Sequence, residues 1–335
     1  MKDSEKREWL TLYECTQKIG EFDPWKRFNE DCCFTYIWNN KELFYSFIKD
    51  SIGKCGIACY IGEKNYLTAR KRLTAPNTKE EPVFCLQDGF VCIWDDRNSL
   101  SKADYDMIKE LGLSFRGKGN WLHFDRYEIG YWPVPISTED VGFLIEAFGN
   151  LHMMLRAIYE DRIDPHFDEG YKLLRWYDPD TKLYYTHCFV VDMPGDIIKP
   201  PVVTLGENPF IDKAKGMSTS DVSIQVDWSY VDAVYYDEQN RETFPLLFLG
   251  IDSKTNVVLF QMMLPPGINK VNFVLNYISR YIDNSGKPRE FTVCDEELRN
   301  ILDDYCRKTG IKLKFKKTLP AMKMLRSYMI NHLDG

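Results

Sequence analysis

The order of elements in the last third of the chain, residues 221–335, limits the fold more than any other feature. Three strand-like runs follow one another at 223–236, 245–252 and 257–264, and each is rich in β-branched and aromatic residues. A helix, a strand, a helix, a strand and a last helix come next. Because parallel neighbours need a crossover connection, strands that alternate with helices predict parallel pairing. We therefore expect one mixed sheet with helices on its faces.

Two further strands are predicted in this block, at 290–294 and 312–316, each between helices. The first ends directly before Asp295, and the second alternates as a half-exposed strand. We expect the strand that carries Val226 to lie beside 290–294. This pairing is the step on which every specific expectation for the block depends.

This order of elements resembles the ribonuclease-H-like fold of nucleases, integrases and transposases. The resemblance implies a carboxylate on the first strand, a second at the end of the fourth and a third on a helix, which together hold two Mg²⁺ ions about 4 Å apart. By position, Asp227 and Asp295 match the first two. The third is missing, because the last helix begins Pro-Ala-Met-Lys-Met-Leu and has Lys323 there instead of an acid.

Both aspartates also have structural interpretations. Asp295 directly precedes a helix, where an N-cap aspartate accepts hydrogen bonds from free backbone N–H groups. Asp227 also fits an outward position on an alternating strand. Two hypotheses therefore stay open: a metal-dependent nuclease that uses Asp227 and Asp295 with Mg²⁺, and a non-catalytic binding protein with a degenerate domain and no cofactor.

Cations are concentrated near the C-terminus. The chain carries a net charge of −7, yet the stretch from Arg307 to Arg326 holds eight Lys and Arg residues and no acid, so the remainder carries −15. Such asymmetry indicates an anionic partner, with nucleic acid as the first candidate. The alternative is that lysines on an edge strand only prevent aggregation. The candidate anion-binding residues are Lys312, Lys314, Lys316, Lys317, Lys323 and Arg326.

The first 165 residues predict an α+β domain. Apolar periodicity and capping signals predict helices at 8–20 and 64–73 and two more that open at Ser101 and Ser137. Strand-like runs are at 33–38, 43–48, 56–61, 83–86 and 90–94, the last two as a hairpin. Residues 166–220 predict a hairpin, 171–177 with 183–191, followed by a connector rich in proline and glycine at 192–220. The α/β domain then occupies 221–335.

The stretch 115–135 has many aromatic residues and no periodicity. Its rings alternate with Arg116, Lys118 and Arg126, a combination that would suit stacking on a single-stranded nucleic acid. We interpret it instead as an irregular loop that its rings anchor to the domain. A protein-interaction role for this stretch stays open as a further alternative.

A second resemblance covers most of the chain. It rests on Glu-Trp-Leu-Thr-Leu-Tyr at 8–13, Leu-Gly-Leu-Ser-Phe-Arg-Gly at 111–117, Lys-Pro-Arg-Glu-Phe-Thr-Val-Cys-Asp at 287–295 and Leu-Pro-Ala at 319–321. With these segments the chain resembles an uncharacterised bacterial family that joins two domains of unknown function in this order. The resemblance implies an intracellular protein and supplies no activity. Family members tend to have acids after Leu-Pro-Ala, where this chain has Met-Lys-Met.

Composition excludes some classes of protein and site. The charged N-terminus does not resemble a secretory signal, and no apolar run approaches the 18 or so residues of a membrane span, so we expect a cytoplasmic protein with no membrane partner. Its ten cysteines would then stay reduced. The pairs Cys32–Cys33 and Cys55–Cys59 do not have zinc-site spacing. The leading hypothesis is an intracellular binding protein that contacts an anion through its basic C-terminal edge.

Overall fold

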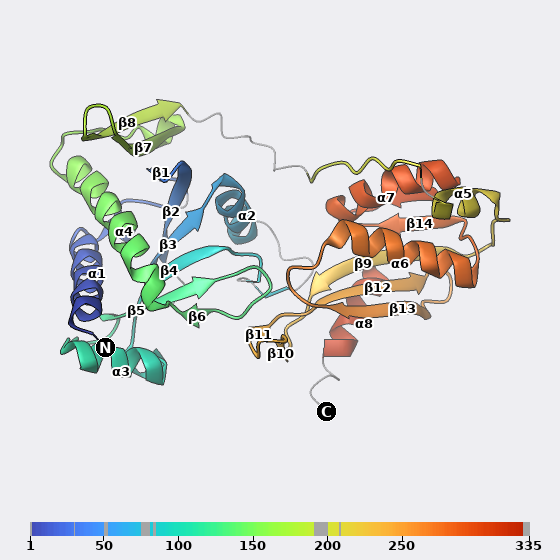
Figure 1. Cartoon of the computed structure of the whole chain (residues 1–335), viewed down its shortest axis with the longest axis horizontal. Coiled ribbons are helices and arrows are strands. Elements are labelled where there is room, and N and C mark those ends of the chain that lie inside the picture. The colour runs from blue at the N-terminus through green and yellow to red at the C-terminus, as the bar shows by residue number, and fades with distance from the viewer. Residues whose placement is uncertain are drawn as a thin grey trace. The chain divides into compact units, whose positions relative to one another are not determined.

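The computed structural model describes residues 2–29, 31–49, 53–74, 81–82, 85–190, 200–207 and 209–330. The chain forms two compact units. Unit 1 comprises Met1–Thr74, Leu86–Glu128 and Pro133–Gly195, and unit 2 comprises Ala75–Cys85, Ile129–Trp132 and Asp196–Gly335. The two units correspond to the blue-to-green and the yellow-to-red elements in Figure 1. Both combine helices with a mixed sheet, as expected.

Unit 1 is built on an eight-stranded sheet with the order β6-β5-β4-β3-β2-β1-β7-β8. All neighbours are antiparallel except β1 and β7, which run parallel. The strands are β1 Cys33–Trp38, β2 Lys41–Lys49, β3 Cys55–Ile61, β4 Gly89–Asp95, β5 Trp121–Tyr127, β6 Val134–Pro135, β7 Tyr171–Asp178 and β8 Leu183–Val190.

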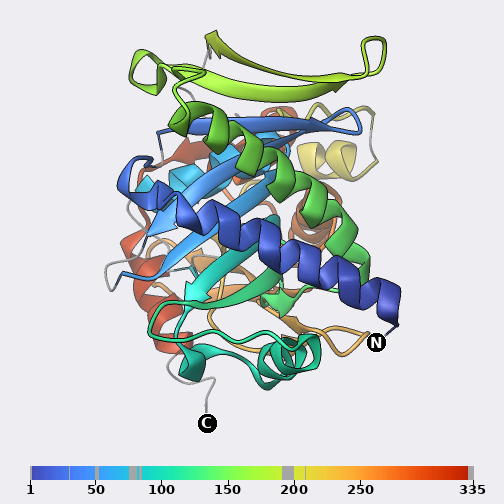
Figure 2. The same cartoon turned by 90° about the vertical axis from the view of Figure 1, so that its left-hand side faces the viewer.

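Two long helices, α1 (Asp3–Glu21) and α4 (Thr138–Tyr159), lie side by side across one face of this sheet (Figure 2). They close the main core because both have an apolar stripe at helical spacing, such as Leu144, Leu151 and Leu155 of α4, all fully buried. The helix α2 (Glu63–Thr74) packs against β2 and β3, where Tyr66 lies over Phe44 in a second cluster. The helix α3 (Lys102–Leu111) is capped by Ser101, as its sequence predicts.

Among the described residues, one helix, α4, is long and apolar enough to cross a membrane, although no apolar run of that length was expected. Half of its most apolar window is buried inside unit 1. Its buried residues belong to the main core cluster with α1 and the sheet. The helix therefore has the environment of a core helix.

Three expectations for this part of the chain need correction. The stretch 115–135 is not an irregular loop throughout, because β5 and β6 lie within it. The alternation of apolar and polar residues in β5 is short, because the second half of the strand is polar. Leu122 and Phe124 are nevertheless both buried in the main core. In the expected hairpin, Cys85 and Leu86 form a turn instead of a strand, and 83–84 lie outside the described residues.

The third correction concerns domain organisation. The hairpin of β7 and β8 is not a separate connector, because β7 pairs with β1 in parallel and so extends the sheet of unit 1. The connector itself contains a helix, α5 (Pro209–Gly216), which belongs to unit 2. Residues 191–199 and 208 of these two predicted segments lie outside the described residues.

Unit 2 has a five-stranded sheet with the order β13-β12-β9-β14-β15. The strands β9, β12 and β13 are antiparallel, and β9, β14 and β15 are parallel, so the mixed sheet is confirmed. Thr292 of β14 pairs with Gln225 of β9, which confirms the expected neighbours. The strands are β9 Ser223–Tyr230, β12 Leu246–Asp252, β13 Val258–Leu264, β14 Glu290–Val293 and β15 Lys312–Phe315, and a small ribbon adds β10 Tyr235–Tyr236 and β11 Glu242–Thr243. The expected first strand thus ends six residues early, at Tyr230.

Helices cover this sheet on both faces. The helix α6 (Lys270–Ser285) packs Phe273 and Tyr277 against the rings of Phe248 and Phe260. The helix α7 (Glu296–Thr309) follows β14, and α8 (Pro320–Ile330) follows β15. The face of the sheet opposite α6 is covered by α8. There Leu319, in the turn before α8, and Met322 of α8 pack in one apolar cluster with Leu249 of β12.

Two segments from the first half of the sequence complete unit 2. The backbone N–H of Gly130 donates to the carbonyl of Cys85, and Phe244 donates to the carbonyl of Gly130. Trp132 stacks on Phe244 with ring centroids 4.3 Å apart. Long-range pairings of this kind leave no local signal in the sequence, so a boundary drawn along the chain could not place these segments.

Candidate functional site

Asp227 lies near the middle of β9, in the interior of unit 2. It is paired with Leu249 of β12 and is only 1% exposed. Its Oδ2 accepts a hydrogen bond of 2.6 Å from Nη1 of Arg326, which is itself 7% exposed. Asp227 is therefore not an outward residue of the strand: it points under α8, where a guanidinium neutralises it.

The position of Arg326 follows from the periodicity of α8. Met322 is fully buried against the sheet, and Arg326 comes one helical turn later, on the same side of the helix. The sequence contained this signal, because the spacing of Met322 and Arg326 is that of a buried stripe. Among the six cations predicted to bind an anion, Arg326 is thus the buried partner of a carboxylate.

Asp295 has the structural role that its place before a helix predicts. It is the N-cap residue of α7, and its Oδ1 accepts a hydrogen bond of 3.0 Å from the backbone N–H of Leu298. Glu296 and Glu297 follow in the first turn, where carboxylates complement the helix dipole. The side chain of Asp295 therefore stabilises the N-terminus of α7.

The carboxylates do not fit a pair of divalent cations in this arrangement. Asp227 holds a guanidinium, Asp295 caps a helix, and the helix that covers the site offers Lys323 instead of an acid. Within the described part of the chain, no three His, Cys, Asp or Glu side chains are grouped so that they could hold a metal ion. A metal pair needs a donor set that encloses both ions.

The remaining five predicted cations are exposed, four of them on or directly after the edge strand β15 and the fifth on α8. Lys314 lies 2.7 Å and Lys312 lies 3.9 Å from Oε2 of Glu290 on the neighbouring β14, so these two lysines share one carboxylate. Lys316 and Lys317 follow β15 and form no ion pair with any described residue. Lys323 is exposed on α8. We call these five lysines the basic edge.

Exposed rings and apolar groups lie beside the basic edge in the sequence. Phe315, between Lys314 and Lys316, is 45% exposed, and the guanidinium of Arg299 lies 5.1 Å from the centre of its ring. On α8, Met324 is 75% and Tyr328 is 61% exposed. Cations next to exposed rings suit an anion that also has a flat face, such as a nucleotide.

Two family models match the chain, the first over most of unit 1 together with the two early segments of unit 2, and the second over most of the rest of unit 2. A family model described as a domain of unknown function (DUF7309) matches residues 9–175, and another, also a domain of unknown function (DUF6930), matches residues 211–330. The chain joins two domains of unknown function. This confirms the pair that the sequence motifs indicate. No curated protein matches the chain.

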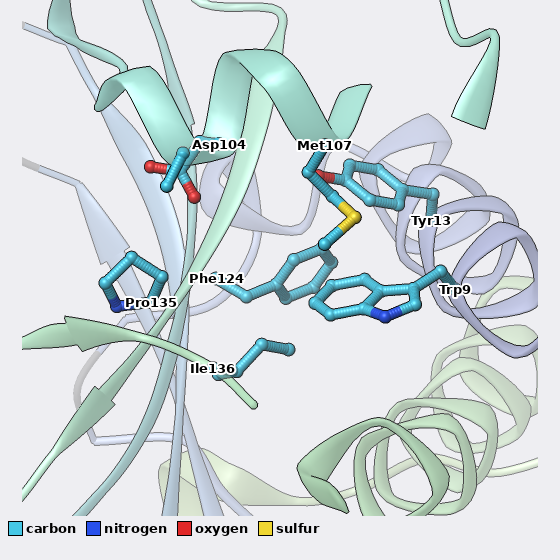
Figure 3. Close-up of a pocket in the computed structure, with 8 residues that line it drawn as sticks. Trp9, Tyr13, Asp104, Met107, Phe124, Pro135 and Ile136 are labelled. Carbon is cyan, nitrogen blue, oxygen red and sulfur yellow. The ribbon is translucent and has the colours of Figure 1, made fainter. Parts of the chain in front are cut away.

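The DUF7309 domain contains a cavity of about 160 Å³ between α1, α3 and β5 (Figure 3). Its walls are mainly apolar, and Asp104 is the one carboxylate among them. The lining residues are Trp9, Tyr13, Ala103, Asp104, Met107, Phe124, Pro135 and Ile136. Burial raises the pKa of the Tyr13 phenol far above its usual range, and the charge of Asp104 raises it further, so Tyr13 stays protonated and has no role as a base.

A second group of titratable side chains lies on the β4–β5 pair of the DUF7309 domain. Nδ1 of His123 is 3.2 Å from Oδ2 of Asp125, and its Nε2 is 4.0 Å from Oδ2 of Asp95. Asp95 also accepts a hydrogen bond of 2.7 Å from Lys54. Burial alone lowers the pKa of His123, but the nearby carboxylates, Asp125 first and then Asp104 and Asp95, together more than offset this, so the pKa is raised. The group is a buried charge network, not an open site.

Proposed function

We propose that this protein is a non-catalytic binding protein whose DUF6930 domain contacts an anionic partner, nucleic acid in the first place, through the basic edge. The observation that carries the proposal is the group of five exposed lysines in and around β15 and α8, in a chain of net charge −7. Lysines that face phosphates gain affinity mainly by releasing condensed counterions.

The ion pairs within the basic edge indicate which of its lysines are best placed to contact an anionic partner. Glu290 already offsets part of the charge of Lys312 and Lys314. Lys316 and Lys317 are therefore the strongest candidates for contact with a phosphate, and the exposed ring of Phe315 beside them offers a surface for a base. This arrangement favours single-stranded nucleic acid over a duplex, because stacking requires an unpaired base.

The topology of unit 2 gives independent support. Three antiparallel strands followed by two parallel ones, with β9 in the centre, is the arrangement expected of a ribonuclease-H-like domain. The occupied carboxylate of Asp227 and the capping role of Asp295 favour a degenerate, non-catalytic version of that fold.

Fluorescence anisotropy with labelled single-stranded and duplex oligonucleotides at low salt tests the proposal. We expect the wild-type chain to bind, and the K316Q/K317Q variant to bind at least about tenfold more weakly. The matched control is K213Q/K254Q, which removes two exposed lysines that lie elsewhere in unit 2. Equal loss of affinity in both variants would show that only the total charge matters and would remove the assignment to the basic edge.

A metal-dependent nuclease is the second hypothesis. Its specific support is that β9, which carries Asp227, pairs with β14, after which Asp295 follows. This hypothesis requires the ion pair between Arg326 and Asp227 to break before a metal ion could bind the carboxylate. Nicking of DNA or RNA that depends on Mg²⁺ or Mn²⁺ and disappears in Asp227→Asn would support this hypothesis, and absence of cleavage by the wild-type chain with either cation would eliminate it.

A further inference from the structure

The cavity of the DUF7309 domain lies where α3 packs on the core along only part of its length (Figure 3). In this helix only Ile108 and Leu111, both in its second half, are buried. The first half presents Ala103, Asp104 and Met107 to the cavity, at spacings of three and four residues that place them on one side of the helix. These three residues therefore form the rim of the cavity.

Three aromatic rings form the floor of the cavity. Trp9 and Tyr13 lie one turn apart on α1, with ring centroids 6.4 Å apart. The ring of Phe124 on β5 meets the ring of Tyr13 edge to face, with centroids 5.2 Å apart. All three residues are at most 4% exposed. Because the face of an aromatic ring carries partial negative charge, such a floor attracts cations as well as apolar groups.

Two polar groups at the cavity have hydrogen-bonding capacity that no described residue uses. The Tyr13 hydroxyl forms no hydrogen bond with any residue that the structure describes, although Tyr13 is only 2% exposed. Figure 3 shows this hydroxyl pointing toward α3, which carries Asp104. The Asp104 carboxylate accepts a hydrogen bond from Ser101 at Oδ2, and within the described part of the chain its Oδ1 has no donor. Since buried polar groups almost always have a partner, the Tyr13 hydroxyl indicates a bound molecule.

The size of the cavity limits the ligand to a small molecule. Its volume is about 160 Å³. An apolar cavity of about 150 Å³ in a protein core is large enough to bind benzene. The apolar part of a ligand here is therefore about the size of one aromatic ring, with room for a short polar group at the rim.

We propose that this cavity binds a small organic ammonium ion, an amine whose apolar body is about the size of one aromatic ring. The body packs on Trp9, Phe124 and Ile136. The ammonium group lies at the rim, where it donates to Oδ1 of Asp104 and to the oxygen of Tyr13. A neutral molecule of the same shape keeps the apolar contacts and loses the contact with the carboxylate, and an anion is repelled by it. The site is independent of the basic edge, which belongs to the other domain.

Benzylamine is the probe, and benzyl alcohol and benzoate are its neutral and anionic counterparts of similar size. Titration of the full chain at neutral pH is followed by NMR of ¹³C-labelled methionine methyl groups. A ring bound in the cavity shifts the signal of Met107, which Met107→Leu identifies by removing it. We expect a saturable shift with benzylamine, binding of benzyl alcohol at least about tenfold weaker, and no binding of benzoate. This comparison uses the wild type alone.

Three variants locate the ligand in the cavity. Asp104→Asn removes the charge at the rim and should weaken benzylamine binding by about tenfold, with little effect on benzyl alcohol. The matched control Asp106→Asn removes the same charge from an exposed position of the same helix and should bind as the wild type does. Ala103→Phe, at another exposed position, places a ring at the rim and should abolish binding of both probes.

The outcomes that would overturn the proposal are distinct. A wild type in which benzylamine causes no saturable shift of Met107 has no such site. Equal affinity for benzylamine and benzyl alcohol would remove the assignment to an ammonium ion. Benzylamine binding that is unchanged in Asp104→Asn, or weakened equally in Asp106→Asn, would show that the Asp104 carboxylate does not hold the ligand.

Discussion

Arg326 of α8 and Asp227 of β9, 99 positions apart in the sequence, form an ion pair in the interior of unit 2. The pair joins α8 to the central strand of the sheet in unit 2. Its two charges are desolvated together, so each depends on the other for compensation. The contact adds to the apolar packing of Leu319 and Met322 that holds the last helix, and it neutralises the carboxylate that the nuclease hypothesis would use.

Removing the guanidinium should destabilise unit 2 strongly. We expect Arg326→Met to lower the free energy of unfolding by about 3–5 kcal/mol, because it leaves a buried carboxylate without its cation. Urea denaturation followed by tryptophan fluorescence measures the change. The double variant Asp227→Leu/Arg326→Met should recover most of the loss, since it removes both charges. A single variant as stable as the wild type would contradict the assigned role of the pair.

Asp304 of α7 fixes the segment before α5. It accepts a hydrogen bond of 2.8 Å from the backbone N–H of Leu205 and lies 3.0 Å from Nζ of Lys308, with Arg307 also in contact. The Leu205 N–H and then Lys308 lower the pKa of Asp304 from 3.8 to about 2. Its contribution to stability is therefore present above the ordinary pKa and is lost as the pH falls towards 2.

We expect Asp304→Asn to be less stable than the wild type at neutral pH, and the difference should narrow between about pH 4 and pH 2. The amide of Leu205 should also exchange faster with solvent in the variant. Acid titrations of unfolding for both chains, at constant ionic strength, measure the first effect. A stability difference that stays constant as the pH falls would show that the carboxylate charge is not the cause.

The raised pKa of His123 predicts the opposite pH dependence in unit 1. Since the pKa lies above the ordinary 6.5, the stability from the His123–Asp125 contact is complete below 6.5 and decreases as the pH rises through the raised value. The variant His123→Gln should lack this decrease. Thermal unfolding between about pH 5 and pH 9 measures it. Parallel curves for wild type and variant would refute the prediction.

Position 250 on β12 must be glycine because the ring of Phe260 on β13 occupies the space that a side chain would need. The two residues are paired, and a Cβ at position 250 would lie 2.1 to 2.5 Å from three ring atoms. We expect Gly250→Ala to cost about 1–3 kcal/mol, because the ring must leave its stacked position against Phe248. In a Phe260→Ala background the same substitution should cost much less. An equal cost in both backgrounds would place the strain elsewhere.

Local patterns predicted most elements of unit 2 and the pairing of their strands. The clearest cases are β14 and β15, whose bounds lie within one residue of the predicted ones, because each is short and enclosed by helix signals. The interpretation of Asp295 as an N-cap residue was also confirmed. In unit 1, β5 was missed because its polar half hides the alternation of Leu122 and Phe124.

What the sequence did not predict depends on contacts between distant segments. The pairing of β1 with β7 and the hydrogen bond between Gly130 and Cys85 join residues with no common local pattern. For the site, Arg326 was counted as a surface cation because charge is usually exposed, although its helical spacing from Met322 indicated burial. Glu290 as the partner of Lys314 follows only from strand order.

The salt dependence of oligonucleotide binding tests the central claim most directly. For a single-stranded oligonucleotide, the logarithm of the association constant should fall linearly with the logarithm of the salt concentration. The slope of K316Q/K317Q should be smaller in magnitude than that of the wild type by about 1.4, roughly 0.7 for each of the two phosphate contacts removed, while K213Q/K254Q keeps the wild-type slope. No measurable binding at low salt, or the same slope for K316Q/K317Q and the wild type, would contradict the account.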